Sequence, residues 1–231
     1  MKPSNWIESV NCAIEGIVWA AKTQRHMRWH LLAAVAVLLL AHFMHLSALE
    51  FILLSFAVTL VMFAELINTA VEVVVDMVSP EYHPLAKRAK DVAAGAVLVA
   101  SIGAVVMGFF ALSRYLLPVL GGQLDQLGAP PGEFPVVSVL VVTFLVVLLK
   151  ARFGRGTPLH GGMPSGHSAV SFSIATAVVF SGAGVVLSLL ALILAVMVSH
   201  SRLLLGIHSF AEVIAGAALG ALTTILIYFF I

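Results

Sequence analysis

Long apolar stretches separated by short polar breaks make up most of this chain. The hydrophobic runs occupy residues 30–46, 48–77, 91–117, 134–150, 166–182, 184–200 and 209–231. About 20 consecutive apolar residues are enough for a helix to cross a hydrocarbon core. The runs also lack the period-two alternation of a membrane β-barrel. The pattern therefore predicts an all-α, polytopic membrane protein with about seven transmembrane helices.

The residues before the first run follow a different pattern. Between residues 5 and 29, apolar side chains recur at helical spacing and are accompanied by basic ones. The apolar positions are Trp6, Ile7, Val10, Ile14, Ile17 and Val18, and the basic ones are Lys22, Arg25 and Arg28. A helix of this kind lies in the membrane interface rather than across the bilayer. We predict an amphipathic surface helix ahead of the first span.

One break between the runs is rich in Pro and Gly. It covers residues 118–133, and clusters of such residues mark loops. We interpret it as a linker between an N-terminal domain of three spans, residues 1–117, and a C-terminal domain of four spans, residues 134–231.

Composition and charge support the membrane prediction and also predict how the chain is oriented in the membrane. Only 10% of the 231 residues are charged, whereas soluble proteins contain about 25%. The net charge of +1 gives no electrostatic case for nucleic-acid binding. All 12 lysines and arginines except Arg114 fall on one side of the seven-span arrangement. Basic loops stay in the cytoplasm. We therefore predict a multi-pass protein of the cytoplasmic (inner) membrane with a cytoplasmic N-terminus.

The second run ends in a stripe of polar side chains. Glu65, Asn68, Glu72 and Asp76 are spaced three, four and four residues apart, so they share one face of a helix. Charges within a span are expensive and indicate function. Carboxylates this close need a positive partner. Two interpretations stay open at this point: a salt-bridged helix at the interface, or a site for a divalent cation and phosphate.

Longer motifs surround this stripe. They are ELINTAVE at 65–72, PEYHPLAKRAKDVAAGAV at 80–97 and KTQRHMRWH at 22–30. Together they resemble the prokaryotic diacylglycerol/undecaprenol kinase family over about residues 5–117. The resemblance implies a three-span kinase that uses Mg²⁺ and ATP to phosphorylate a lipid alcohol. It also implies a homotrimer with composite sites between subunits at the cytoplasmic interface.

The resemblance also assigns roles to individual residues. It implies that Glu65 is the base on the lipid hydroxyl and that Glu72 is a metal ligand. Asn68, Asp76 and Lys90 would hold the nucleotide, with Lys90 on its phosphates.

The chain departs from this family at one metal-binding position. Many members carry a glutamate where this sequence has Gln24. An amide keeps one oxygen ligand but loses a charge, so the metal should bind less tightly at Gln24 and Glu72.

A second group of residues opens the fifth run. The segment Gly161-Gly162-Met163-Pro164-Ser165-Gly166-His167 places glycines just before a helix. The N-terminus of a helix offers free amides and the positive end of its dipole to a phosphate. We expect Ser165 to donate to a phosphate through both its hydroxyl and its amide.

A matching group precedes the last run. Arg202 lies six residues before His208, and Glu212 follows His208 by four. At this spacing a carboxylate can hold one imidazole nitrogen and leave the other for chemistry. A lone histidine at a helix end would more simply be a cap or a packing residue, but the complete set favours phosphoryl transfer through a histidine nucleophile.

Further along the last run, Gly216 and Gly220 form a pair of small residues one turn apart. Such a pair fits either close packing of helices or an interface, and the sequence leaves both open.

The motifs PSGH at 164–167 and Ser201-Arg202…His208…Glu212 resemble the type 2 phosphatidic acid phosphatase superfamily over about residues 134–231. The resemblance implies that His167 attacks the phosphorus and that His208, with Glu212 behind it, is the general acid and base. The residues implied to hold the phosphate are Lys150, Arg155, Ser165, Gly166 and Arg202, and no metal or cofactor is required.

The chain departs from this superfamily in three respects. Glu212 replaces an aspartate, the arginine of the first motif is missing, and four spans stand where six are usual. Arg155 or Arg152 could supply the missing charge from nearby.

Together these features predict a membrane lipid kinase joined to a lipid phosphate phosphatase, with both sites on the cytoplasmic face and membrane lipids as substrates. Two alternatives remain: a phosphatase whose kinase-like half is only a trimeric scaffold, and a non-catalytic membrane or transport protein.

Overall fold

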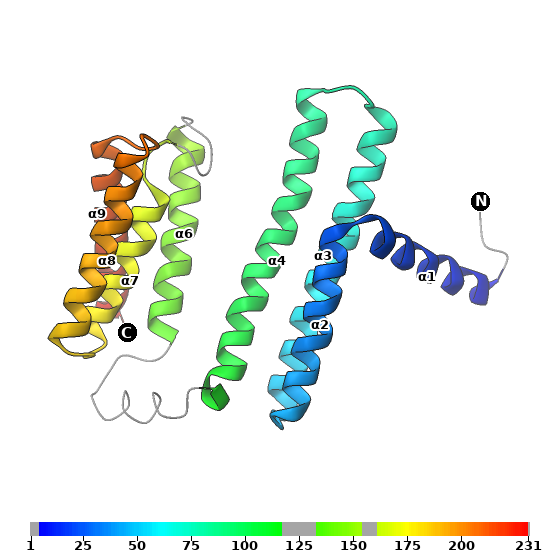
Figure 1. The fold of residues 1–231 in the computed structure, drawn as a ribbon, viewed down its shortest axis with the longest axis horizontal. Helices are drawn as coiled ribbons and strands as arrows, with labels where there is room; N and C mark the ends of the chain where they lie inside the picture. The colour runs from blue at the N-terminus through cyan, green and yellow to red at the C-terminus, as the bar shows by residue number, and fades with distance from the viewer. Residues whose placement is uncertain (1–4, 117–132, 154–160, 231) are drawn as a thin grey trace. The chain divides into compact units, whose positions relative to one another are not determined.

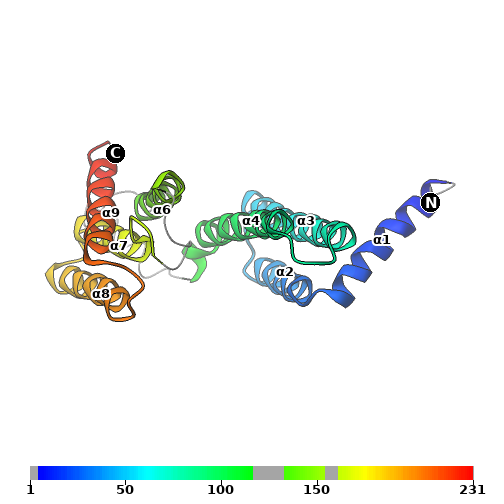
Figure 2. The same cartoon turned by 90° about the horizontal axis from the view of Figure 1, so that it is seen from above.

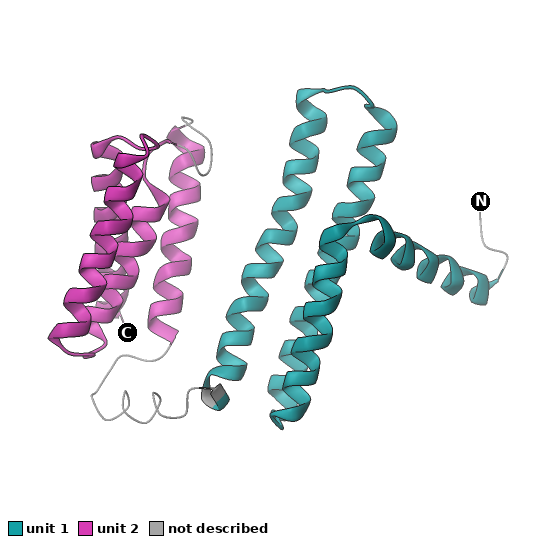
Figure 3. Ribbon diagram, viewed as in Figure 1, with its two compact units in different colours: residues 1–118 teal, residues 119–231 magenta. Residues whose placement is uncertain are grey.

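The structure is a computed structural model that describes residues 5–116, 133–153 and 161–230. Every regular element in these ranges is an α-helix (Figure 1). The helices are α1 (Trp6–Thr23), α2 (Arg25–Phe43), α3 (Ala48–Val78), α4 (Pro84–Leu116), α6 (Glu133–Phe153), α7 (Gly166–Phe180), α8 (Val185–Leu204) and α9 (Phe210–Phe230). The chain forms two compact units, Met1–Pro118 and Val119–Ile231 (Figure 3).

Six of the helices are long and apolar enough to cross a membrane: α2, α3, α4, α6, α8 and α9. The seventh predicted span is α7, which is apolar but has only 15 residues and is therefore about 22 Å long. The prediction of an all-α, polytopic membrane protein is confirmed. The predicted linker lies outside the described residues except for Glu133, which begins α6.

In the first unit, α3 lies between α2 and α4 (Figures 1 and 2). The helix begins with a capping box, in which Ser47 and Glu50 satisfy each other's backbone amides. Buried Ala41, Leu54 and Ala111 join the three helices near one end. Many larger apolar side chains remain exposed, as expected for helices that face lipid or another protein.

The predicted surface helix is shorter than expected. It ends at Thr23, because Gln24 has an extended backbone conformation and its amide donates to the carbonyl of Ala20. Arg25 and Arg28 therefore belong to α2 and not to the surface helix. Arg28 nonetheless caps α1, since its guanidinium donates to the carbonyls of Ala21 and Lys22. The helix α1 points away from the three-helix bundle (Figure 1).

The third span also begins earlier than predicted. Helix α4 starts at Pro84, where proline is favoured because the first turn needs no amide donor. The basic residues Lys87, Arg88 and Lys90 consequently lie on the helix and not in a loop.

In the second unit, α7 packs against α6, α8 and α9 (Figures 1 and 2). The core contains Val142, Val146 and Ala169. Inside it, Ser173 of α7 and Thr224 of α9 share a hydrogen bond of 2.7 Å, and both side chains are fully buried.

Two glycines of α9 allow this close packing. A Cβ atom on Gly216 would collide with the carbonyl of Ser165, and one on Gly220 would collide with the carbonyl of Ala169. The backbones of α7 and α9 therefore touch, which only glycine permits. Within the described residues, the pair Gly216 and Gly220 thus packs inside its own unit.

Candidate active sites

The polar stripe of the first unit runs from the interior of the bundle to its surface. Glu65 is only 4% exposed and Asn68 8%, whereas Glu72 is partly buried and the side chain of Asp76 is 64% exposed. The stripe follows α3, whose 31 residues exceed what one crossing needs. A lipid headgroup and a water-soluble reactant could therefore meet along a single helix face.

Two buried oxygens on or directly beside this stripe have no partner in the part of the chain that the structure describes. The amide of Asn68 donates to Glu72 Oε1 at 3.1 Å, but Asn68 Oδ1 and Thr69 Oγ1 accept or donate no hydrogen bond within the described residues. Buried polar atoms are nearly always paired. Oxygen atoms beside two carboxylates suit a hard cation such as Mg²⁺, so this donor set fits the metal that the sequence implies.

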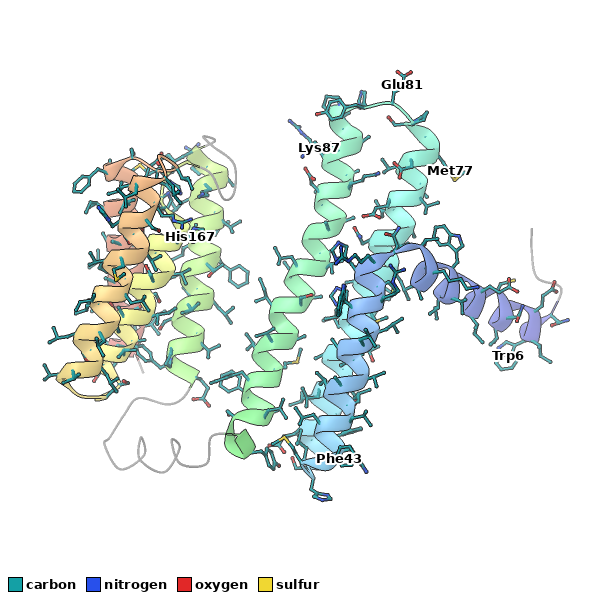
Figure 4. All side chains as sticks on the ribbon, viewed as in Figure 1. Trp6, Phe43, Met77, Glu81, Lys87 and His167 are labelled. Atoms are coloured by element: carbon teal, nitrogen blue, oxygen red, sulfur yellow. The ribbon has the colours of Figure 1, made fainter. Side chains whose placement is uncertain are left out.

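The predicted nucleotide residues Asp76 and Lys90 do meet. Lys90 Nζ on α4 forms a salt bridge with Asp76 Oδ1 on α3. The pair lies on a cleft of about 410 Å³ lined by residues on both sides of the turn between the two helices. Lys87, labelled in Figure 4, is paired with Asp91 one turn away. Asp76 thus fits the interpretation of the stripe as a salt-bridged helix. Within the described residues, no salt bridge involves Glu65 or Glu72.

The predicted metal ligand Gln24 lies at the bend between α1 and α2 and is partly buried. The structure shows no hydrogen bond between Gln24 and Glu72. In the described part of the chain, no three acids, histidines or cysteines lie close enough together to hold a metal ion.

The second unit brings its predicted residues together at one end. Gly161 and Gly162 have φ angles of 75° and 84°, a left-handed conformation that glycine adopts at low cost. They lead into α7, whose first turn carries the exposed side chain of His167 (Figure 4). Ser165 precedes the helix and is fully buried, and Ser168 Oγ donates to its hydroxyl at 3.2 Å.

One expectation for Ser165 is wrong. Its amide does not point into a phosphate site, because it donates to the main-chain carbonyl of Glu212 at 2.9 Å. That bond joins the turn before α7 to the first turn of α9. Only the hydroxyl of Ser165 is left to donate to a phosphate.

The predicted dyad of His208 and Glu212 is present. His208 Nδ1 lies 2.9 Å from Glu212 Oε2, and the histidine side chain is 1% exposed. The backbone of the preceding turn holds the ring in place, because the amides of Ile207 and His208 both donate to the carbonyl of Arg202. With Nδ1 engaged, Nε2 is the nitrogen available for proton transfer.

Two basic side chains lie near His167. The imidazole of His167 lies within electrostatic range of Arg202, His208 and Lys150. Lys150 Nζ donates to the carbonyl of Gly161 at 3.0 Å. The guanidinium of Arg202 is steadied by two hydrogen bonds of 3.1 Å to the hydroxyl of Ser201. Arg155 lies outside the described residues.

Sequence reasoning missed three contacts of this site. Ser168 supports Ser165, Ser209 donates its amide to Glu212 Oε2 at 3.0 Å, and Gly162 donates its amide to the same carboxylate. The motif Ser-x-x-Glu at 209–212 is a known signature of a helix start and could have revealed Ser209. Nothing in the sequence signals the other two contacts.

Comparison with known proteins identifies both halves. Residues 11–112 match the family model of prokaryotic diacylglycerol kinase, and residues 151–231 match that of the PAP2 superfamily. The chain is 45% identical over 117 residues to a diacylglycerol kinase of Synechocystis sp., which covers 50% of this chain and 67% of the relative.

Two further relatives are also kinases. The chain is 40% identical over 93 residues to an undecaprenol kinase of Bacillus subtilis, covering 40% of this chain and 76% of the relative. It is 47% identical over 75 residues to a diacylglycerol kinase of Escherichia coli, covering 31% of this chain and 62% of the relative. Both resemblances found in the motifs are confirmed.

Proposed function

We propose that this chain, which belongs to the prokaryotic diacylglycerol kinase family through its N-terminal domain and carries a C-terminal PAP2 superfamily domain, catalyses two reactions on membrane lipids. The first is ATP-dependent phosphorylation of a lipid alcohol of the diacylglycerol or undecaprenol class. The second is hydrolysis of a lipid phosphate. The domains would be residues 1–117 and 134–231, joined by the linker at 118–133.

In the kinase reaction, Glu65 accepts the proton of the lipid hydroxyl while that oxygen attacks the γ-phosphorus of ATP and the bond to the β-phosphate oxygen breaks. Asn68, Asp76 and Lys90 hold the nucleotide, with Lys90 on its phosphates. Glu72 and the neutral Gln24 are the proposed ligands of Mg²⁺, which neutralises phosphate charge when bound. The buried position of Glu65 and the unpaired oxygens beside it support this assignment.

In the phosphatase reaction, His167 attacks the phosphorus and forms a nitrogen–phosphorus bond as the bond to the lipid oxygen breaks. His208 gives a proton to that leaving oxygen, and Glu212 stabilises the imidazolium form of His208 beforehand. His208 then takes a proton from water, whose oxygen attacks the phosphorus and releases His167. Lys150, Arg202, the Ser165 hydroxyl, the Gly166 amide and Arg155 stabilise the phosphate oxygens.

The observation that carries this proposal is the hydrogen bond between buried His208 and partly buried Glu212, within electrostatic range of the exposed His167 in the first turn of α7. The decisive experiment supplies purified protein with a panel of lipid alcohols and labelled ATP. Separately, it supplies lipid monophosphates and diphosphates without ATP. We expect labelled lipid in the first arm and free phosphate in the second. Phosphate release alone would leave a phosphatase with a scaffold domain, and neither product would indicate a non-catalytic protein.

The two domains should act on different lipids, so that the phosphatase does not hydrolyse the product of the kinase. A kinase and a phosphatase that shared one substrate pair would only hydrolyse ATP. The panel tests this point directly, because the product of the first arm can be offered as the substrate of the second. Rapid hydrolysis of that product would contradict the separation.

We further propose that the kinase domain assembles as a homotrimer whose sites are shared between copies. This proposal is supported by the exposed apolar side chains of the first unit and by the buried oxygens of Asn68 and Thr69 that lack a partner within the described residues. The copies would lie in the cytoplasmic (inner) membrane with the N-terminus and both sites facing the cytoplasm, because nearly all basic residues fall on that side.

Orientation can be tested by cysteine labelling. The native Cys12 is exposed and is first replaced by alanine. Single cysteines are then introduced at the exposed positions Met163, beside the site, and Val185, at the start of α8. An impermeant maleimide added to intact cells should label Val185→Cys and spare Met163→Cys. Labelling of position 163 from outside would reverse the proposed orientation.

A further inference from the structure

Ser209 lies between the two members of the proposed proton-transfer pair. It is the residue directly before α9, and Glu212 is the third residue of that helix. The amide of Ser209 donates to Glu212 Oε2 at 3.0 Å, and the amide of Glu212 donates to Ser209 Oγ at 3.4 Å. These reciprocal bonds form a capping box, which satisfies two backbone donors at a helix start.

The capping box uses the same carboxylate oxygen that faces His208. Glu212 Oε2 accepts the bond from Ser209 and lies 2.9 Å from His208 Nδ1. A glutamate side chain is mobile in water because it has three rotatable bonds. Here the bond to the helix start fixes the end of that side chain at the place where the imidazole needs it.

The length of the side chain at position 212 matters for this arrangement. A capping box requires Glu or Gln at the third helical position, since the side chain must reach back to the residue before the helix. The phosphatase motif that this segment resembles has an aspartate at this position, which is one methylene shorter. In this chain the carboxylate of Glu212 therefore caps the start of α9 and also contacts the imidazole of His208.

We propose that Ser209 is a positioning residue of the phosphatase site, which acts through Glu212 on the orientation of His208. The inference rests on the proposed phosphatase function. Ser209 itself touches no substrate in this scheme. Its hydroxyl fixes the first turn of α9, and the fixed turn keeps the carboxylate of Glu212 on Nδ1 of His208.

The test compares serine with residues that can and cannot cap a helix. Ser209→Ala should lower kcat for phosphate release roughly fivefold with KM unchanged, because alanine is a poor cap. Ser209→Thr and Ser209→Asn should keep kcat within about twofold of wild type, because both cap well despite their different shapes. A purely structural role would lower the unfolding temperature of Ser209→Ala and leave kcat unchanged below that temperature.

A double-mutant cycle shows whether the effect passes through Glu212. In the Glu212→Ala background there is no carboxylate to position, so adding Ser209→Ala should leave kcat unchanged. An equal loss of kcat in both backgrounds would overturn the proposal.

An NMR measurement tests the role of Ser209 independently of the proposed function. The chain has nine histidines, and the signal of His208 in ¹⁵N-histidine NMR is identified by its loss in His208→Gln. Neutral His208 should carry its proton on Nδ1 in wild type and Ser209→Thr, and should become a mixture of tautomers in Ser209→Ala. An unchanged signal in Ser209→Ala would overturn the inference. Wild-type protein that releases no phosphate from any lipid phosphate would overturn the proposed function instead, and the NMR result would still decide the role of Ser209.

Discussion

The two units of this protein build their candidate sites in different ways. In the second unit, the turn before α7, the turn before α9 and the first turn of α9 are joined by hydrogen bonds that meet at Glu212. In the first unit, the polar residues lie along α3, and two buried oxygens remain unpaired within the described residues. We therefore expect the second site to work within one copy and the first to need groups from another copy.

Exposed large apolar side chains are common to both units: Phe63 of α3 is 61% exposed and Leu148 of α6 is 65% exposed. The second unit adds a close backbone contact, because glycines bring the backbones of α7 and α9 together. Close packing of this kind holds neighbouring side chains in fixed positions.

The largest effect should come from the proposed nucleophile of the second unit, His167. His167→Ala should reduce phosphate release about 10⁴-fold, since the reaction loses its covalent step. It should leave lipid phosphorylation unchanged. The measurement is release of labelled phosphate from lipid phosphates. His200→Ala is the matched control, because His200 is exposed and has no assigned role. Loss of both activities in His167→Ala would mean that the two sites are not independent.

The corresponding change in the candidate site of the first unit is Glu65→Gln. It should reduce ATP-dependent lipid phosphorylation about 10³-fold because a general base is lost, while phosphate release persists. Transfer of labelled phosphate from ATP to lipid measures the effect. Glu8→Gln, an exposed position in the first turn of α1, serves as the control. Kinase activity that survives Glu65→Gln would assign the base to another residue.

Isolating single copies should separate the two sites without any mutation. In nanodiscs that each hold one copy, lipid phosphorylation should fall about tenfold or more, because reacting groups supplied by a second copy are no longer in place. Phosphate release should stay within about twofold of its value in larger bilayers. Equal retention of both activities would contradict the idea that only the first site is shared.

The smallest effect concerns packing. Gly220→Ala should destabilise the second unit by about 1–3 kcal/mol, because the added methyl group collides with the backbone of α7. Thermal unfolding in detergent measures the loss. Gly103→Ala in α4 is the control, since nothing lies within 4 Å of its Cβ position. That variant should be neutral or stabilised by up to about 1 kcal/mol. A stable Gly220→Ala would show that α7 and α9 can move apart.

Much of the fold and chemistry could be predicted from local spacing. The apolar runs located the helices, since a bilayer demands about 20 apolar residues in a row. The spacing of His208 and Glu212 predicted their contact, although His208 lies in the turn before α9 and not on the helix itself. The stripe from Glu65 to Asp76 was predicted because residues three or four apart share a helix face. The salt bridge between Asp76 and Lys90 could not be predicted in this way, because it depends on the turn between α3 and α4 that brings the two helices together.

Other features depended on contacts that spacing does not encode. The sequence predicted a surface helix to residue 29, but the bend at Gln24 divides it. It predicted two donors on Ser165, but packing against α9 engages the amide. Gly216 and Gly220 were open to two interpretations until the helix that they face was known.

The sequence by itself determined that this protein crosses a membrane, and its motifs identified the two families whose chemistry it shares. These properties depend on hydrophobicity and on residues near one another in the chain. Only the tertiary structure decided that the main-chain carbonyl of Glu212 accepts the amide of Ser165, which joins the turn before α7 to the first turn of α9. These two turns are separated in the chain by α7 and α8, so their meeting depends on how α7 and α9 pack.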